Sequence, residues 1–178
     1  MVRPARPEDA GPIAEIQLRG LPEAYAGHVR AEHFDLRTLP ERRKEWADEI
    51  AARVPRRGVL VAEADGEVAG FVRFGPTRDQ AADRTVTGEV MTMFVAEERR
   101  RRGVGQALMA AAEAALREHG FTVATLWMAV GNEPARRFYE AAGWRVDGGE
   151  KLEPVGSVLA SCVRYRIELP SSGAAARP

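Results

Sequence analysis

Apolar residues along the chain follow the period of a strand in some segments and the period of a helix in others. Strand-like patterns occupy seven segments: Val2–Ala5, Val59–Ala64, Glu67–Phe74, Thr87–Val95, Thr122–Val130, Arg145–Glu150 and Ser157–Leu169. Helical spacing runs through four others: 6–21, 38–54, 104–119 and 132–142. The predicted order is strand, two helices, three strands, helix, strand, helix and two strands. Such alternation is typical of a layered sheet with helices on its faces.

Cap and turn residues predict several element boundaries. Thr38 is followed three residues later by Glu41, which is the pattern of a capping box at a helix start. Asp65-Gly66 separates two apolar runs and predicts a two-residue hairpin, because that turn needs positive φ. Pro22 predicts the end of the first helix, since proline lacks the N–H that a helix interior uses. Gly75–Thr85 is polar without a period and predicts a loop.

Length and composition point to one globular domain. The chain has 178 residues, and we expect residues 1–169 to form the domain and residues 170–178 a flexible tail. The 26 basic residues equal the 26 acidic residues in number, which argues against a general nucleic-acid binder. Without an apolar stretch of about 18 residues, no membrane span is expected. The first nine residues do not resemble a signal peptide, so a cytoplasmic protein is expected.

The cysteine and histidine counts limit the chemistry. Cys162 is the single cysteine and the histidines number three, so the sequence predicts neither an intrachain disulfide nor a Cys/His metal site. Cys162 lies on the last predicted strand. A covalent route through this thiol would need an activating base nearby. We therefore interpret Cys162 as a buried structural thiol.

The segment Arg100–Gly105 carries the most informative chemistry. A predicted strand ends at Val95, and a glycine-bearing turn then opens a helix. The first N–H groups of a helix lack internal partners and carry partial positive charge, and glycine lets a ligand approach the backbone. Together with the arginines, this predicts an anion site suited to a pyrophosphate. The alternative is a solvated basic turn capped by Glu97 and Glu98. The pattern matches neither a Walker loop nor a Rossmann fingerprint.

Two motifs resemble those of GNAT (GCN5-related N-acetyltransferase) enzymes. Arg100-Arg101-Arg102-Gly103-Val104-Gly105 is similar to the Gln/Arg-x-x-Gly-x-Gly/Ala signature, and Asn132–Trp144 is similar to the family's Asn, Ala, Phe-Tyr and Gly-Trp block. The likeness covers roughly 2–169 and is strongest over 89–144. It implies an α/β fold whose central, mostly antiparallel mixed sheet of about seven strands is splayed at the cofactor cleft and flanked by four helices.

The resemblance also implies acetyl-CoA as cosubstrate, with no metal. Backbone groups of the strand before the loop would pair with the pantetheine arm, and the loop would hold the pyrophosphate. Carried over to this chain, the cofactor residues are Met93, Phe94, Val95, Arg100, Arg101, Arg102, Gly103, Val104, Gly105 and Asn132. For Asn132 a contact with the pantetheine arm and a plain helix N-cap remain equally open.

Tyr139 and Glu89 are the candidate catalytic residues. A phenol can donate a proton or hydrogen bond to the leaving thiolate, so Tyr139 is the expected acid; the alternative is a core aromatic beside Phe138. An alkyl ammonium must lose a proton before attack, which at pH 7 costs roughly 4–5 kcal/mol. Glu89 is the expected base, and a charged strand end is the alternative. We expect direct transfer to a primary amine in a ternary complex; the alternative is a catalytically inactive CoA-binding or ligand-sensing protein.

The acceptor cannot be identified from the sequence, beyond a small-molecule or peptide amine. The family shapes its acceptor site with loops that here correspond to residues 20–37 and 75–87, and these contain no recognisable pattern. Family analogy also suggests a homodimer, for which Val155–Leu169 offers a strand edge.

Overall fold

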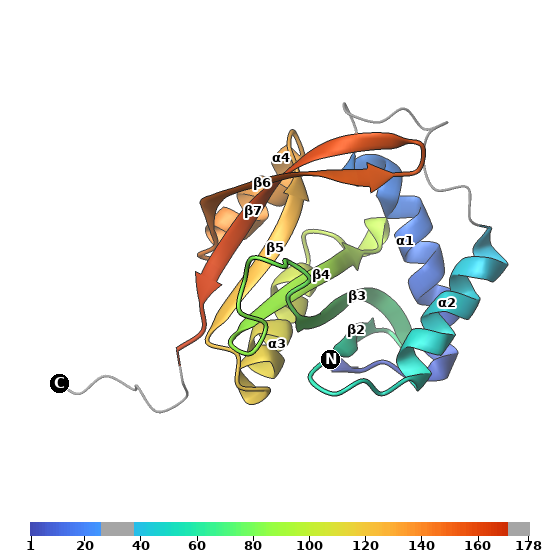
Figure 1. Ribbon diagram of the computed structural model, residues 1–178. Helices are drawn as coiled ribbons and strands as arrows, with labels where there is room; N and C mark the ends of the chain where they lie inside the picture. The colour runs from blue at the N-terminus through green and yellow to red at the C-terminus, as the bar shows by residue number, and fades with distance from the viewer. Residues whose placement is uncertain (26–37, 171–178) are drawn as a thin grey trace.

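The computed structural model describes residues 1–25 and 38–170, which form a seven-stranded sheet with helices on both faces. The strands lie across the sheet in the order β1-β2-β3-β4-β5-β7-β6 (Figure 1). Along the chain they are β1 (Val2–Pro4), β2 (Gly58–Ala64), β3 (Glu67–Pro76), β4 (Thr87–Val95), β5 (Val123–Ala129), β6 (Arg145–Val155) and β7 (Val158–Glu168). The helices are α1 (Ala10–Ala24), α2 (Leu39–Ala51), α3 (Val104–Glu118) and α4 (Glu133–Ala141). The predicted element order and fold class are confirmed.

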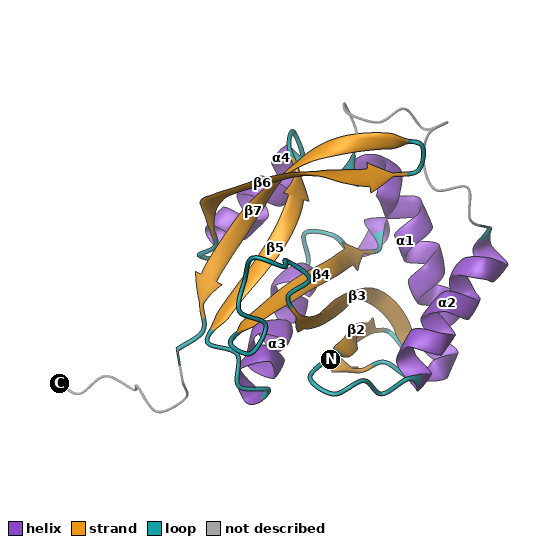
Figure 2. Cartoon of the chain, viewed as in Figure 1, coloured by secondary structure: helices purple, strands orange, loops and turns teal. Residues whose placement is uncertain are grey.

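The helices divide between the two faces of the sheet (Figure 2). On one face, Ile13 of α1 and Trp46 of α2 pack with Phe71 of β3 in an apolar cluster. On the other face, Leu108 of α3 packs with Trp144 and the inward side chains of the central strands. No helix in the described ranges is long and apolar enough to cross a membrane.

The central strands β4 and β5 diverge. Their parallel pairing covers only Thr87–Val90 against Val123–Leu126, whereas every other strand pair is antiparallel. Beyond Val90, β4 stays paired to β3 as far as Val95, and β5 stays paired to β7. Among the described residues, the β5-facing edge of 91–95 therefore has no strand partner. The predicted splay of the sheet is confirmed.

The local signals predict most boundaries correctly. Asp65 and Gly66 have φ values of 55° and 79°, as the hairpin between β2 and β3 requires. Glu41 accepts the backbone N–H of Thr38 at 2.7 Å, and Thr38 Oγ1 accepts the N–H of Glu41 at 3.5 Å, so the capping box of α2 is present. These two hydrogen bonds satisfy backbone N–H groups at the start of α2 that would otherwise lack partners.

Several boundaries differ from the prediction. Pro22 lies inside α1, which continues to Ala24; a proline this near the end removes one backbone bond, and Asn132 Nδ2 holds the last turn by donating to Ala24 O at 3.1 Å. α2 ends at Ala51 rather than at residue 54, and β6 extends to Val155 because it stays paired to β7. The prediction that residues 155–169 offer a strand edge for a dimer is wrong for β7, because β7 lies between β5 and β6. The outer strand is β6. Residues 171–178 of the predicted tail, and most of the predicted 20–37 loop, lie outside the described residues.

Candidate functional site

The diverging ends of β4 and β5 open into a cleft of about 1190 Å³. Of the residues predicted for the site, those that line it are Met93, Phe94, Val95, Arg100, Arg101, Gly103, Gly105, Asn132 and Tyr139. Arg102, Val104 and Glu89 do not line it, and Val104 packs its side chain against the core instead. The structure therefore brings residues of both sequence motifs into one cleft.

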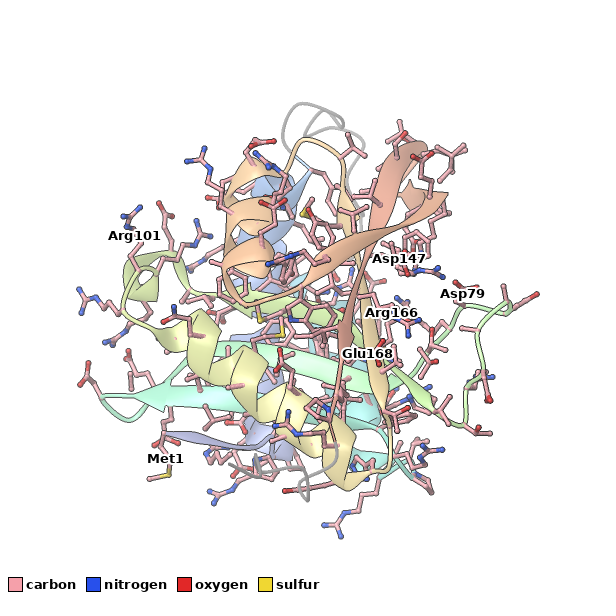
Figure 3. The ribbon with its side chains drawn as sticks, turned by 90° about the vertical axis from the view of Figure 1, so that its left-hand side faces the viewer. Met1, Asp79, Arg101, Asp147, Arg166 and Glu168 are labelled. Atoms are coloured by element: carbon pink, nitrogen blue, oxygen red, sulfur yellow. The ribbon has the colours of Figure 1, made fainter. Side chains whose placement is uncertain are left out.

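One end of the cleft is a helix N-terminus. After β4 the chain turns through Arg101, with φ of 58°, and Gly103, with φ of 81°, and α3 begins at Val104. The first backbone N–H groups of α3 have no partner within the helix and carry its partial positive charge. Gly105 packs so closely that a Cβ there would lie 3.3 Å from the Phe138 ring. Figure 3 shows Arg101 on this loop, at the surface of the molecule.

The arginines of this loop have different environments. Arg100 donates to Glu23 Oε2 of α1 at 2.5 Å and to Val95 O at 3.3 Å, so its guanidinium is already paired. Arg99 contacts acidic residues of the β2–β3 turn, among them Asp65. Arg101 and Arg102 are exposed. The geometry thus favours the backbone of the helix start, with Arg101 beside it, as the anion-binding element.

Asn132 uses both halves of its amide within the protein. Its Oδ1 accepts the N–H of Ala135 at 3.2 Å and caps α4, while its Nδ2 donates to Ala24 O at 3.1 Å. The N-cap is present in the structure. A direct contact between Asn132 and a ligand stays a prediction.

Tyr139 lies on α4 and lines the cleft in an aromatic group. Its ring packs edge-on against Phe138 with centroids 5.3 Å apart, and lies 6.0 Å from the Tyr165 ring. Burial raises the pKa of Tyr139 to about 12, so the phenol is protonated at neutral pH. No described residue hydrogen-bonds to its hydroxyl, which leaves that group available to a bound molecule.

Glu89 is buried and fully engaged. Its Oε2 accepts the N–H of Arg78 at 2.7 Å and the Thr77 hydroxyl at 3.5 Å. Its Oε1 accepts Arg78 Nε at 3.0 Å and Nη2 at 2.5 Å. Because a carboxylate has about four acceptor positions, these four donors use its capacity. Arg78, rather than Glu89, lines the cleft. Sequence reasoning missed Arg78, because only the strand register places it against Glu89.

The far end of the cleft contains further residues that the motifs do not mark. Trp127 of β5 lines it, and Lys151 Nζ lies 4.4 Å from the centre of its ring. The end of β6 and the turn that follows it contribute 153–156, and Tyr25, which follows α1, also lines the cleft. Burial raises the pKa of Tyr25 to about 12, so this phenol is neutral. The sequence did carry a signal for Trp127, because it is an aromatic residue on the strand that borders the predicted gap in the sheet.

Cys162 is buried and does not line the cleft. Its Sγ donates to Ala160 O at 3.7 Å, and burial raises the pKa of the thiol. A thiol that resists ionisation is a poor nucleophile. The prediction of a buried cysteine is confirmed.

Comparisons with known proteins agree with this geometry. The sequence profile of the acetyltransferase (GNAT) family matches residues 21–144. The uncharacterized N-acetyltransferase YuaI of Bacillus subtilis is 30% identical over 141 residues, which cover 79% of this chain and 77% of the relative. The phosphinothricin N-acetyltransferase of Streptomyces viridochromogenes is 27% identical over 144 residues, covering 80% and 77%.

A solved structure extends the likeness to the whole fold. The yncA protein of Salmonella typhimurium, determined with its cofactor acetyl-CoA, superposes with a TM-score of 0.72 at 20% identity. The superposition covers 100% of this chain and 96% of the other. The profile match spans more than half of the chain and includes both motifs that meet at the cleft. This chain therefore belongs to the acetyltransferase (GNAT) family.

Proposed function

We propose that this protein transfers the acetyl group of acetyl-CoA to a primary amine, directly, in a ternary complex. The observation that carries the proposal is the β4–β5 cleft, which joins an anion-binding helix start to a protonated Tyr139. The relatives named as N-acetyltransferases support a catalytic protein, and they do not favour an inactive ligand-binding one.

The cleft offers suitable groups along the length of acetyl-CoA. The strand edge of residues 91–95 presents backbone groups that lack a strand partner among the described residues, and these suit the amides of a pantetheine arm. The N–H groups at the start of α3, with Arg101 beside them, suit the pyrophosphate. Gly103 and Gly105 keep this approach free of side chains.

Tyr139 would serve the leaving thiolate. A phenol with a pKa of about 12 is a weaker acid than an ordinary thiol, whose pKa is about 8.5. Complete proton transfer to a solvated thiolate would therefore be uphill. A hydrogen bond from Tyr139 to the developing negative charge is favourable, and transfer becomes easier in a dry cleft that also raises the thiol's pKa. We therefore assign Tyr139 as the hydrogen-bond and proton donor.

Glu89 would accept the amine proton, directly or through water. In the structure its four acceptor positions hold donors from Thr77 and Arg78, so one donor must withdraw before Glu89 accepts a proton. Arg78 is about half exposed and can move more easily than the buried carboxylate. Proton acceptance by Glu89 is the second element of the proposal. Acetyl transfer to an amine that is already neutral does not require a base.

The proposal is tested by thiol release from acetyl-CoA with a panel of amines: amino acids, amino-acid amides, polyamines, aminoglycosides and peptide N-termini. We expect amine-dependent release and a matching acetylated product by mass spectrometry. Calorimetric binding of acetyl-CoA without acetylation of any amine would instead identify a ligand-binding protein. Failure of acetyl-CoA to bind would overturn the site itself.

We also propose a homodimer, in which β6 is the strand available for pairing. β6 is the outer strand on its side of the sheet, and Leu152 on β6 and Leu159 on β7 are each 59% exposed. Sedimentation velocity at micromolar concentration should show a dimer that Leu152→Asp weakens. A monomer throughout would end this part of the proposal.

A further inference from the structure

Glu89 holds the Arg78 guanidinium along one edge. A guanidinium carries five N–H donors in a planar fork, and Glu89 accepts from Nε and Nη2. Nη1 and the second hydrogen of Nη2 form the adjacent edge at the end of the fork, and no described residue accepts from Nη1. Because the Arg78 side chain is 47% exposed and lines the cleft, this edge is available to a bound molecule. Two parallel N–H groups of this kind match the two oxygens of a carboxylate.

The loop that carries Arg78 is fixed in place. Thr77 donates its N–H to Thr87 O at 3.0 Å, and Asp79 pairs with Arg164 of β7. Arg164 Nε also donates to Asp147 of β6 at 2.9 Å. Figure 3 shows Asp79 and Asp147 on the same side of the molecule, opposite Arg101. Arg78 is therefore positioned before any ligand binds, which lowers the entropy cost of binding.

Arg78 also stands where the acetyl group would be transferred. Glu89 immediately precedes Val90, the last β4 residue that pairs with β5, so the Arg78–Glu89 pair marks the point where the cleft opens. The loop with Arg78 and the helix α4 with Tyr139 lie on opposite faces of the sheet (Figure 1). An acceptor that contacts Arg78 would approach the thioester from the face opposite Tyr139.

The charges at this end favour an acceptor with an anionic group. Apart from Glu23 and the cofactor-loop arginines, the charged residues that line the cleft are Arg42, Arg78 and Glu153; Arg42 is paired with Glu45, and Glu153 with Lys151. Tyr25 stays neutral at pH 7. A polyamine would therefore meet the Arg78 guanidinium, and the one carboxylate among these residues, Glu153, already has a cation partner. A molecule with a carboxylate near its amine would be attracted.

We propose that Arg78 binds a carboxylate of the acceptor, and that the acceptor is a free amino acid or a close analogue with an amine and a carboxylate. Glu89 is then a positioning residue for Arg78. This inference rests on the proposed function, because it names the substrate class of the same site. It applies to the Glu89–Arg78 contact that the structure shows, in which Glu89 accepts from Arg78 Nε and Nη2.

The test compares amino acids with their α-amides, which keep the side chain and the amine but lose the carboxylate. Acetyl-CoA is the donor, and kcat/KM is measured for leucine, methionine and glutamate against their amides. We expect the natural chain to prefer the acid by about 10²-fold or more, because a site built around a charged group rejects the analogue that lacks it. Arg78→Lys keeps the charge but loses the fork, so the preference should fall at least about tenfold.

Removing Arg78 alone leaves Glu89 buried without its cation, and that variant risks unfolding. The double variant Arg78→Met with Glu89→Gln removes both charges and should abolish the preference, with the KM for acetyl-CoA within about twofold of the natural value. Arg84→Met is the matched control, because Arg84 is exposed in the same loop and does not line the cleft. It should keep the preference.

The outcomes separate this inference from the proposed function. Equal rates with acids and amides in the natural chain, or an unchanged preference in both Arg78 variants, would overturn the role of Arg78 while leaving acetyl transfer intact. Acetylation of polyamines alone would do the same. If no amine is acetylated by any variant, the proposed function and the role of Arg78 fail together.

Discussion

Arg100 Nη1 lies 2.5 Å from Glu23 Oε2, so an ion pair joins the last turn of α1 to the loop that opens α3. In the same turn, Ala24 O accepts Asn132 Nδ2 from the start of α4 at 3.1 Å. The end of α1 therefore contacts both sides of the cleft. Since Arg100 lines the cleft near the proposed pyrophosphate site, Glu23 and an entering pyrophosphate would compete for the same guanidinium.

Glu23→Gln should strengthen acetyl-CoA binding. Glu23 and Arg100 are 53% and 38% exposed, so their pair is weak, and its loss frees Arg100 for the phosphates at little cost. We expect an affinity gain of about twofold to fivefold by calorimetry, larger at low salt. Glu15→Gln is the control, because Glu15 lies on the same helix and does not line the β4–β5 cleft. Weaker binding in Glu23→Gln would mean that the pair supports the site.

Two glycines flank α3 with the same backbone angle and allow a matched test of the anion site. Gly103 and Gly120 both have φ of 81°, and neither has a crowded Cβ position. Alanine at either position should cost stability by about 1–2 kcal/mol, because L-residues are strained there. Gly103→Ala alone should also weaken acetyl-CoA binding, since Gly103 lines the cleft. Equal affinities in the two variants would remove Gly103 from the site.

The order of the elements and the cofactor end of the cleft could be predicted from local patterns. Residues 100–105 and 132–144 carry their signals within a few positions, because a helix start, a turn or a cap depends on neighbours in the sequence. The hairpin at Asp65-Gly66 succeeded for the same reason. The prediction from Pro22 was wrong because Asn132, 108 positions from Ala24 along the chain, supports the last turn of α1 through its contact with Ala24 O.

The acceptor end could not be predicted, because its residues meet only through the register of the sheet. Arg78 sits in a loop without a motif, and its role depends on Glu89 eleven positions later, in the next strand. Trp127 and Lys151 meet across β5, β7 and β6, and no local pattern pairs them. Glu89 was found by resemblance, but its engagement with Arg78 became visible only in the structure.

Asp9 should make the fold sensitive to acid. Its carboxylate accepts Arg3 Nη1 at 2.7 Å and the N–H of Arg6 at 2.7 Å, and its side chain is 5% exposed. Burial raises the pKa of Asp9, but these hydrogen bonds from Arg3 and Arg6 outweigh burial and lower it overall. A carboxyl with a lowered folded pKa stabilises the fold above its ordinary pKa, and this contribution is lost as the pH falls through the folded value.

Asp9→Asn should therefore lower the free energy of unfolding by about 1.5–3 kcal/mol at pH 7, the usual range for hydrogen bonds to a charged group. Below about pH 4 the difference should shrink, because Asp9 itself becomes neutral. Urea denaturation at pH 7 and pH 3 measures both values. Asp48→Asn removes an exposed pair with Lys44 and should change the free energy of unfolding far less than Asp9→Asn does. A pH-independent loss in Asp9→Asn would show that packing, not charge, stabilises this corner.

Tyr139→Phe removes only the phenol oxygen and keeps the ring packing with Phe138 and Tyr165. If Tyr139 stabilises the leaving thiolate, kcat should fall by about 10²-fold or more, while the affinity for acetyl-CoA stays nearly unchanged. Tyr165→Phe is the matched control. Its hydroxyl contacts Glu140 at 3.4 Å and does not line the cleft, so kcat should stay within about twofold and stability should fall by about 1 kcal/mol.

The pH dependence tests the same hydroxyl in the natural chain. Because burial raises the pKa of Tyr139 to about 12, the phenol stays protonated at every pH below about 11, and kcat should not fall between pH 8 and pH 10. An ordinary tyrosine, with a pKa of about 10, would lose half of its donor form at pH 10. A falling basic limb near pH 10 that disappears in Tyr139→Phe would keep the donor role but place the phenol in water rather than in a dry cleft. A level profile combined with full activity in Tyr139→Phe would instead remove Tyr139 from catalysis, and the thiolate would then have to be stabilised by backbone N–H groups along the cleft.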